Sequence, residues 1–291
     1  MADHFVSVII PHYNDPQSLA LCLDALERQT IPQSAYEIIV ADNMSPVGIE
    51  AVKHAVAARG QIVEVPIAGA GPARNGGVTI ATGEILAFTD SDCVPDPAWI
   101  ENGIEALKSA DIVGGKMIVT VASTQRMTAT EAFEKVFAFA NEDYVKRKHF
   151  TVTANLFVRR NDFDRVGGFR VGVSEDQEWC LRARALGLDI SYAENAVVAH
   201  PARREWADLI RKWRRIISEQ YQITVERPFG HLRWIAKTSI IPLSIIVHIP
   251  KIFLSRNTPG LRNRMAALCG LVRIRLWRFV ASTRIIFSRS A

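Results

Sequence analysis

The strongest constraint on the fold is an alternation of strand-like and helix-like segments near the N-terminus. Short apolar, β-branched runs occur at 5–10, 36–41, 61–65 and 84–89. Segments with helical character lie between them at 16–29, 48–59 and 72–82. This alternation is typical of βα units, in which helices cover both faces of a parallel sheet. The sequence therefore predicts an α/β fold with a parallel sheet.

Polar clusters directly follow three of these runs, at His12–Asp15, Asp42–Asn43 and Asp90–Asp92. In parallel sheets, ligands bind outside the carboxyl ends of the strands. Because the three clusters occupy equivalent positions, we expect them to meet at one edge of the sheet and to form a binding site.

Asp90 and Asp92 are separated by one residue and follow a buried strand. Two carboxylates on one turn can share a hard divalent cation, Mg²⁺ or Mn²⁺, and leave room for substrate phosphates. The same spacing also occurs in solvated turns that bind no metal. The pair alone therefore indicates a metal site without establishing one.

The glycine-rich segment 69–77 precedes a helix but matches neither common phosphate-binding pattern. Arg74 stands where the dinucleotide pattern requires glycine, and the segment lacks the Gly-Lys-Ser/Thr of a P-loop. Arg74 could contact a nucleotide or phosphate from the start of the helix, or it could be a surface arginine on a turn.

Between residues 110 and 200 the alternation is looser. We expect one long strand or a strand pair at 111–121, helices at 127–140 and 175–186, a strand at 151–160, and short strands at 190–192 and 196–199. Glu175 and Asp176 begin the second helix, where a carboxylate either caps the helix or acts as a general base. A lone histidine such as His200 is more often structural than a ligand.

Charge divides the chain into two parts. Residues 1–202 carry 17 basic and 26 acidic side chains, a net of −9, whereas residues 203–291 carry 18 and 4, a net of +14. The last acidic residue is Glu226. The asymmetry predicts one domain at 1–204 and a second at 205–291, the latter with a polyanionic partner.

The second part contains basic amphipathic helices near 205–221 and 265–280. The apolar stretch 235–254 has an uninterrupted part too short for a spanning helix, so we expect it to lie in a membrane interface. Three interpretations compete, namely an anionic membrane surface, packing against the first domain and nucleic-acid binding. We favour the membrane, because the sequence has no known nucleic-acid-binding motif.

The cysteines and the N-terminal residues bear on location. Four cysteines are widely spaced, and the N-terminus lacks the basic and apolar regions of a secretion signal. We therefore expect a protein of a reducing compartment.

Six segments in a fixed order resemble the family 2 glycosyltransferases, which are inverting enzymes with the GT-A fold. The segments are VSVIIPHYND at 6–15, IVADNMS at 39–45, GPARN at 71–75, ATGEILAFTDSD at 81–92, VGGF at 166–169 and EDQEWCLR at 175–182. The resemblance covers roughly residues 5–205. It implies a nucleotide-binding half at about 1–110, an acceptor-binding half at about 111–204 and a basic helical extension at 205–291.

The resemblance also implies roles for individual residues. Asp176 matches the catalytic base, and Asp92, Asp90 and His200 match a site for Mg²⁺ or Mn²⁺. The implied nucleotide and donor contacts are Pro11, His12, Tyr13, Asn14, Asp42, Arg74, Asp90, Ser91, Asn155 and Glu175. Among these, Asp42 would contact the base, Arg74 the base and diphosphate, and Asn155 the donor sugar.

These roles agree with the chemistry of glycosyl transfer. A divalent ion stabilises the charge that develops on the leaving diphosphate, and one carboxylate can accept the proton of the acceptor hydroxyl. We expect transfer of a single hexose, with a UDP-sugar favoured, to a saccharide. The family link suggests a polyprenyl-diphosphate-linked acceptor in bacterial exopolysaccharide, capsule or O-antigen synthesis, and no nucleic-acid partner.

His12 and Asn43 depart from the residues commonest in the family, which leaves the donor open. Two alternatives to this function remain. One is a non-catalytic subunit that binds nucleotide sugars or glycans, and the other is a nucleotidyltransferase on a similar scaffold.

Overall fold

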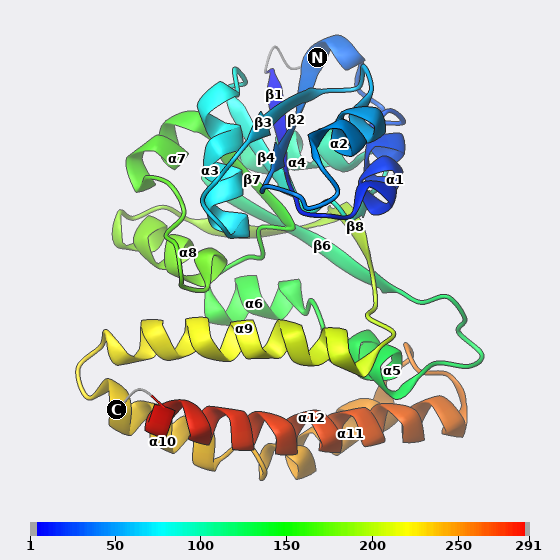
Figure 1. The fold of residues 1–291 in the computed structure, drawn as a ribbon, viewed down its shortest axis with the longest axis vertical. Coiled ribbons are helices and arrows are strands. Elements are labelled where there is room, and N and C mark those ends of the chain that lie inside the picture. The colour runs from blue at the N-terminus through cyan, green and yellow to red at the C-terminus, as the bar shows by residue number, and fades with distance from the viewer. Residues whose placement is uncertain (1–4, 289–291) are drawn as a thin grey trace. The chain divides into compact units, whose positions relative to one another are not determined.

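The first of two compact units is built on a sheet. The computed structural model describes residues 5–288, and the described parts of this unit are 5–118, 139–171 and 175–200. Within residues 5–288, eight strands form one sheet in the order β3-β2-β1-β4-β7-β6-β8-β5 (Figure 1). The strands are β1 (Val6–His12), β2 (Tyr36–Asp42), β3 (Gln61–Glu64), β4 (Ile85–Thr89), β5 (Val94–Pro95), β6 (Ile112–Thr120), β7 (Asn155–Arg159) and β8 (Ile190–Pro201).

The sheet is parallel over its first four positions and antiparallel beyond them. β1 pairs in parallel with β2 and β4, and β2 pairs in parallel with β3. β7 is antiparallel to β4 and β6, and β5 is antiparallel to β8. The parallel part places the carboxyl ends of β1, β2 and β4 at one edge, as the polar clusters predict.

Helices cover both faces of the sheet (Figure 1). They are α1 (Pro16–Leu26), α2 (Ile49–Val56), α3 (Ala70–Ile80), α4 (Trp99–Leu107), α6 (Asn141–Lys148), α7 (Arg160–Val166) and α8 (Glu175–Ala185), with a 3₁₀ turn η1 (Gln33–Ala35). Because side chains alternate along a strand, Val8 joins a core with α1, α2 and α4, whereas Ile9 joins a core with α7 and α8. α3 packs on the Ile9 face through Gly77, where a Cβ would lie 2.6 Å from Ile9.

The α/β fold is confirmed, and several element boundaries differ from the prediction. The expected strand at 151–160 is only β7, and the two short strands expected at 190–199 are one strand, β8. The expected strand at 111–121 is the single strand β6. The helices α4, α6 and α7 were not predicted. α6 has little apolar periodicity and is fixed by tertiary contacts such as the buried Asn141 amide, which donates to the Gly115 carbonyl.

The second unit is helical, and its described parts are 119–138, 172–174 and 201–288. Its helices are α5 (Ala129–Phe137), α9 (Trp206–Val225), α10 (Gly230–Ser239), α11 (Ser244–Leu254) and α12 (Gly260–Ser288). Thr128 and Glu131 form a capping box at the start of α5, which satisfies two backbone N–H groups. Phe133, Leu209 and Leu271 lie in one core of this unit.

Close packing between α5 and α12 depends on Gly270. A Cβ there would lie 2.4 Å from the Ala129 carbonyl oxygen. This packing places residues 119–138 with the C-terminal helices, whereas the charge pattern put them in the domain 1–204. The two divisions therefore differ over α5.

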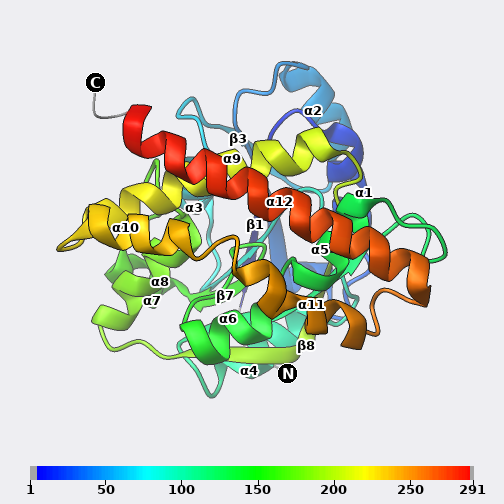
Figure 2. The ribbon, with the colours of Figure 1, turned by 90° about the horizontal axis from the view of Figure 1, so that it is seen from below.

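No single helix among residues 5–288 is both long and apolar enough to cross a membrane. Only when α10 and α11 are taken together is the segment long and apolar enough, and the two helices are bent by 56° relative to each other. In Figure 2, α10 and α11 follow one another and α12 runs alongside both.

Candidate active site

The ends of β1 and β2 are joined by a buried polar network. His12 Nδ1 lies 2.8 Å from Asp42 Oδ1, and the Asp15 backbone N–H donates to His12 Nε2 at 3.2 Å. The Ser45 hydroxyl donates to Asp42 Oδ1 at 2.5 Å and its backbone N–H donates to Oδ2 at 3.0 Å. Through these contacts His12 joins the loops that follow the two strands.

The ionisation of Asp42 follows from this network. Burial favours the neutral acid, but the hydrogen bonds from Ser45 and His12 outweigh it and lower the pKa of Asp42 below its usual value. Both carboxylate oxygens are engaged and the residue is buried. Asp42 therefore joins the loops after β1 and β2 through its contacts with His12 and Ser45.

Asn14 and Asn43 shape the same loops. Asn14 has a positive φ of 56°, and its Oδ1 accepts from the Val47 N–H at 3.1 Å. The Asn43 amide donates to the carbonyls of Val65 and Ile67, at 2.8 and 2.7 Å, and so holds the segment that follows β3. The departure from the family's commoner residue at position 43 therefore has a structural role here.

The turn after β4 brings the predicted metal ligands together. Ligand atoms of Asp90, Asp92 and Cys93 all lie within 4.8 Å of one another. His200, at the end of β8, places Nε2 3.3 Å from Asp92 Oδ2, and its ring lies 4.5 Å from the Phe139 ring.

The donor set at this turn fits Mg²⁺ or Mn²⁺. Carboxylate oxygens are the ligands that these hard cations prefer, and an imidazole nitrogen is also acceptable to Mn²⁺. Burial, with the nearby Asp90 and Asp92 carboxylates, raises the pKa of the Cys93 thiol well above its ordinary value. The thiol therefore stays protonated and is a poor ligand for a hard ion.

Arg74 links the metal turn to the start of α8. Its guanidinium donates to Asp90 Oδ1 at 2.5 Å and to Glu175 Oε1 at 3.0 Å. The Arg74 side chain is buried, and burial would favour its neutral form, but the two carboxylates outweigh this and raise its pKa. Arg74 therefore carries a charge and couples Asp90 to Glu175, which lies 101 residues after Arg74 in the sequence.

Two buried polar atoms beside this bridge lack partners. Among residues 5–288, neither Arg74 Nε–H nor the Thr89 hydroxyl at the end of β4 has a hydrogen-bond partner. Buried polar groups are normally paired, so these atoms mark places where a polar ligand or water fits.

Asp176 lies in the first turn of α8, directly after Glu175. Its Oδ1 accepts a hydrogen bond from the Gln177 backbone N–H at 2.8 Å. The helix dipole at this end favours the carboxylate form. Burial, with the Asp176 charge as a smaller cause, raises the pKa of Cys180 to about 12 and also raises the pKa of Tyr144.

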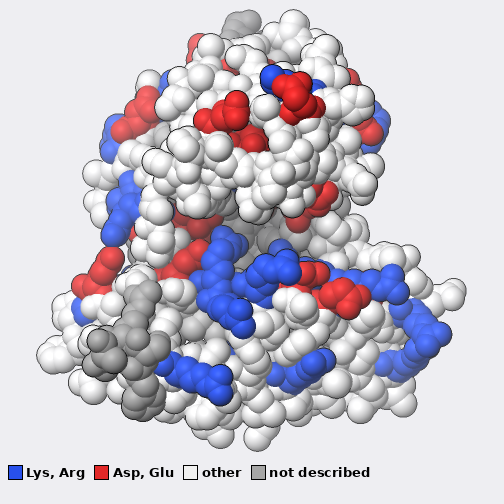
Figure 3. Space-filling model, viewed as in Figure 1, with Lys and Arg blue, Asp and Glu red and all other residues white. Residues whose placement is uncertain are grey.

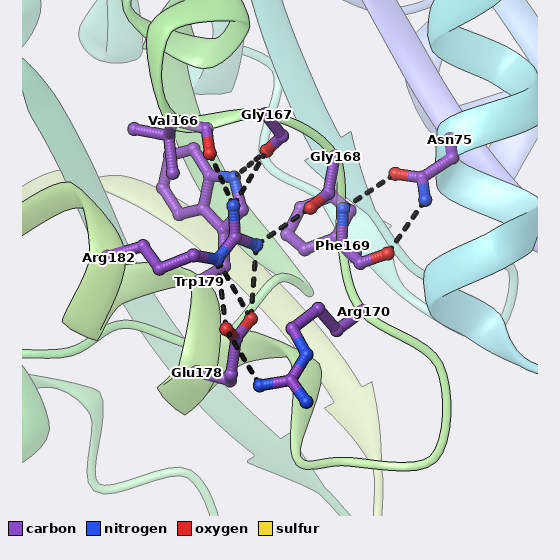
Figure 4. Close-up of polar contacts among 9 residues, drawn as sticks. All are labelled: Asn75, Val166, Gly167, Gly168, Phe169, Arg170, Glu178, Trp179 and Arg182. Carbon is purple, nitrogen blue, oxygen red and sulfur yellow. Dashed lines mark hydrogen bonds and ion pairs between the residues drawn. The ribbon is translucent and has the colours of Figure 1, made fainter.

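A hydrogen-bonded clamp holds α8 against the Val-Gly-Gly-Phe loop (Figure 4). Arg182 is paired with Glu178 and donates to the carbonyls of Val166, Gly167 and Gly168. On the other side of the loop, Asn75 of α3 donates to the Phe169 carbonyl and accepts from its N–H, both at 2.8 Å. The clamp fixes the start of α8, and hence Asp176, relative to α3 and Arg74.

Asn155 is placed differently from the expectation that it faces the donor sugar. It is fully buried, and both amide N–H groups donate to carbonyls, those of Lys116 and Ala196. Its Oδ1 accepts from the Trp99 indole at 2.9 Å. With both donors used in joining β6 and β8, Asn155 has a structural role in this arrangement.

The remaining predicted donor contacts lie at the same edge of the sheet. Pro11 is partly buried in β1, Ser91 is partly buried between the two aspartates, and Tyr13 is 60% exposed. Ser45 and Arg182 were not among the predicted site residues. Two local patterns could have predicted them. A serine three residues after an aspartate often hydrogen-bonds to its carboxylate, and Glu178 and Arg182 have the i, i+4 spacing of an ion pair on a helix.

Comparison with known proteins identifies the class. Residues 7–172 match the family described as glycosyl transferase family 2. The chain therefore belongs to glycosyl transferase family 2, and it is a glycosyltransferase with a GT-A-like fold.

Similar proteins come from archaea and bacteria. The chain is 32% identical to the glycosyltransferase AglE of Haloferax volcanii over 245 residues, which are 79% of this chain and 80% of that protein. It is 27% identical over 190 residues to YwdF of Bacillus subtilis, an uncharacterised glycosyltransferase, covering 62% of this chain and 67% of that protein.

A solved structure shares the fold. The mannosyltransferase PcManGT from Pyrobaculum calidifontis, in complex with GDP-Man and Mn²⁺, superposes with a TM-score of 0.62 at 18% identity. The match covers 95% of this chain and 88% of that protein.

Proposed function

We propose that this glycosyltransferase moves a single hexose from a nucleotide diphosphate sugar to a saccharide, with inversion at the anomeric carbon. The observation that carries the proposal is the Arg74 bridge. It joins Asp90, on the turn predicted to bind metal, to Glu175, which precedes the proposed base Asp176. One buried arginine thus supports a single site built from the donor-side and acceptor-side motifs.

The proposed reaction is one displacement. The acceptor oxygen forms a bond to the anomeric carbon while the bond from that carbon to the diphosphate oxygen breaks. The acceptor proton passes to the Asp176 carboxylate. The position of Asp176 in the first turn of α8, directly after the Arg74 partner Glu175, supports this role.

Asp90, Asp92 and His200 are the residues proposed to hold the divalent cation. When bound, such an ion neutralises charge on the leaving diphosphate. The exposed Tyr13 ring offers a surface for stacking on the base, with Pro11, Asn14 and Ser91 as further donor contacts. His12 and Asp42 support these contacts by holding the loops. We propose a UDP-sugar first and a GDP-sugar second, because the structural neighbour was solved with GDP-Man.

The acceptor is proposed to be linked to a polyprenyl diphosphate at the inner face of the plasma membrane, in bacterial cell-surface polysaccharide synthesis. The net charge of +14 over residues 203–291 supports an anionic leaflet and a diphosphate as partners. Nucleic acid is not proposed, since the site belongs to a nucleotide-sugar enzyme.

A donor panel tests the function. The protein is assayed for nucleoside diphosphate release from UDP-, GDP- and dTDP-sugars, with Mn²⁺ or Mg²⁺ and a membrane lipid extract. Asp176→Asn should lower turnover by about 10³-fold while donor binding persists. The exposed Asp164→Asn serves as the matched control and should leave turnover unchanged.

Two outcomes would replace the proposal. Release of pyrophosphate instead of a nucleoside diphosphate would indicate a nucleotidyltransferase. Donor binding without release from any sugar nucleotide would indicate a non-catalytic binding subunit. Wild-type turnover in Asp176→Asn would show that another group is the base.

A further inference from the structure

The outer side of α10 and α11 carries an exposed apolar surface, which we call the α10–α11 face. Its most exposed members are Leu232, Ile240, Leu243, Ile246, Val247 and Leu254. Apolar side chains scattered singly over a surface are ordinary, but a contiguous apolar face marks an interaction site.

The two sides of α11 show that the exposure is not incidental. Ile252 is fully buried, and His248, four residues earlier, contacts the Phe137 ring at 5.7 Å, so this side packs on α5. Ile246 and Val247 lie on the opposite side and are 71% and 74% exposed. Within α11, Ser244, His248 and Lys251 recur at helical spacing and form a polar stripe. An amphipathic helix normally buries its apolar side, whereas α11 leaves part of its apolar side exposed.

α10 repeats this arrangement. Trp234 is buried, donates through its indole to the Ser282 carbonyl at 3.0 Å and packs against Tyr221. Leu232 lies away from this contact and is exposed. Since packing within the helical unit already uses the inner sides of both helices, the outer sides remain for another partner.

The basic residues of these helices indicate which partner fits the α10–α11 face. Arg233 in α10 and Arg256 just after α11 are exposed, and no acidic residue follows Glu226 in the sequence. Lys237 and Lys251 turn towards Thr224 and the Phe137 ring instead. In the view of Figure 3, Lys and Arg predominate on the helical unit, whereas the sheet unit shows both signs. A second copy of this chain would bring like charges together, whereas an anionic bilayer offers apolar depth and opposite charge.

The geometry favours lying in the bilayer surface over crossing it. α11 has 11 residues, so at about 1.5 Å per residue it is roughly half as long as the hydrocarbon core is thick. The 56° bend separates it from α10. Pro250 has no N–H to donate to the Ile246 carbonyl, and an unpaired carbonyl is better tolerated near the headgroups than in hydrocarbon.

We propose that the α10–α11 face inserts its apolar side chains into the interfacial layer of an anionic bilayer, with Arg233 and Arg256 at the headgroups. This inference rests on the membrane location in the proposed function and assigns the contact to particular residues.

The arginines of α12 play a different part. The Arg273 and Arg278 guanidinium groups stack on the Trp206 and Trp213 rings of α9, with their carbon atoms 4.0 and 3.8 Å from the ring centroids. These groups are used in packing the helical unit. Binding should therefore depend more on the apolar face than on the net charge of α12, and salt should weaken it only partly.

Vesicle co-sedimentation tests the proposal with the full chain. The double variant Ile246→Glu/Val247→Glu should bind vesicles of phosphatidylcholine and phosphatidylglycerol at least about tenfold more weakly than the wild type. The matched control Leu21→Glu replaces a similarly exposed apolar residue of α1 and should bind as the wild type does. Wild-type binding by the double variant would overturn the proposal.

A label gives a second readout that does not depend on a destabilising change. Val247→Cys with Cys269→Ser, labelled at position 247 with an environment-sensitive fluorophore, should shift to the blue on adding these vesicles. An unshifted label, or binding abolished by high salt alone, would overturn insertion. Light scattering that shows a dimer through this face would also overturn it.

Donor binding and nucleotide release, measured without lipid, separate this proposal from the proposed function. They should be unchanged in the double variant if insertion alone is lost. A wild-type protein that binds vesicles but releases no nucleoside diphosphate from any donor would count against the function instead.

Discussion

The two units each contain one buried ion-pair centre, and the two centres have opposite signs. In the sheet unit, the cation Arg74 lies between Asp90 and Glu175. In the helical unit, the anion Glu134 lies between Arg203 and Lys212, at 3.1 and 3.0 Å. Each central charge has two partners of the opposite sign. The three groups together therefore carry a net charge with the sign of the two outer groups.

The difference matches the chemistry proposed for each unit. The sheet unit keeps carboxylates beside Arg74 that suit a cation and a proton. The helical unit keeps cations that suit a phosphate surface. Where its arginines lack carboxylates, aromatic rings take their place, as in the Arg278–Trp213 stack.

Removing the central anion should have the largest effect on stability. Glu134→Gln leaves Arg203 and Lys212 without their partner, so we expect a loss of about 3 kcal/mol of unfolding free energy at neutral pH. Urea denaturation followed by circular dichroism measures it. Glu105→Gln, which breaks an exposed pair on α4, is the control and should cost less than about 1 kcal/mol.

The same residue predicts a pH dependence. Burial opposes ionisation of Glu134, but Lys212 and Arg203 outweigh it and lower its pKa in the folded state. The stabilisation is therefore present above the unfolded pKa of about 4.3 and is lost as the pH falls through the lower folded value. The unfolding free energy of Glu134→Gln should fall less steeply over this range, and a parallel fall would contradict the pairing.

Removing the central cation should cost somewhat less, because its partners are less buried. Arg74→Met leaves Asp90 and Glu175 facing each other, and we expect a loss of about 2 kcal/mol. Turnover should fall as well, since both motifs lose their common anchor. Thermal unfolding and the nucleotide-release assay measure the two effects, and an unchanged melting temperature would show that the bridge is not formed.

Metal-dependent donor binding should respond to Asp92. In Asp92→Ala, the affinity for the donor in the presence of Mn²⁺ should fall by at least about tenfold, measured by calorimetry. The Mn²⁺-free affinity should change little. Equal Mn²⁺ dependence in variant and wild type would remove Asp92 from the metal site.

The smallest effect is expected at Arg278. Burial, with the nearby Arg275, lowers the pKa of Arg278 to about 9, so holding this charge costs free energy. Arg278→Met keeps contact with the Trp213 ring without the charge, and stability should change by less than about 1 kcal/mol. A loss as large as that of Glu134→Gln would show an anionic partner for Arg278.

Local patterns predicted the parts of the site that depend on strand order. His12, Asp42 and Asp90 follow apolar runs directly, so their meeting at one edge could be inferred from the βα alternation. The Arg74 bridge and the Asn155 network could not, because their partners are distant in sequence. Asn155 shows this clearly, since a polar residue on a predicted strand can face a ligand or a neighbouring strand.

The sequence alone determined the α/β fold, the family and the acidic and basic parts, because these depend on periodicity, motif order and composition. Only the tertiary structure decided which charges pair and which apolar sides remain exposed. α11 has apolar residues on two of its sides, and its packing on α5 buries Ile252 and leaves Ile246 and Val247 exposed. Pairing and burial depend on neighbours that folding brings together. Composition therefore shows that the C-terminal part is basic, but it does not show that α10 and α11 expose apolar side chains.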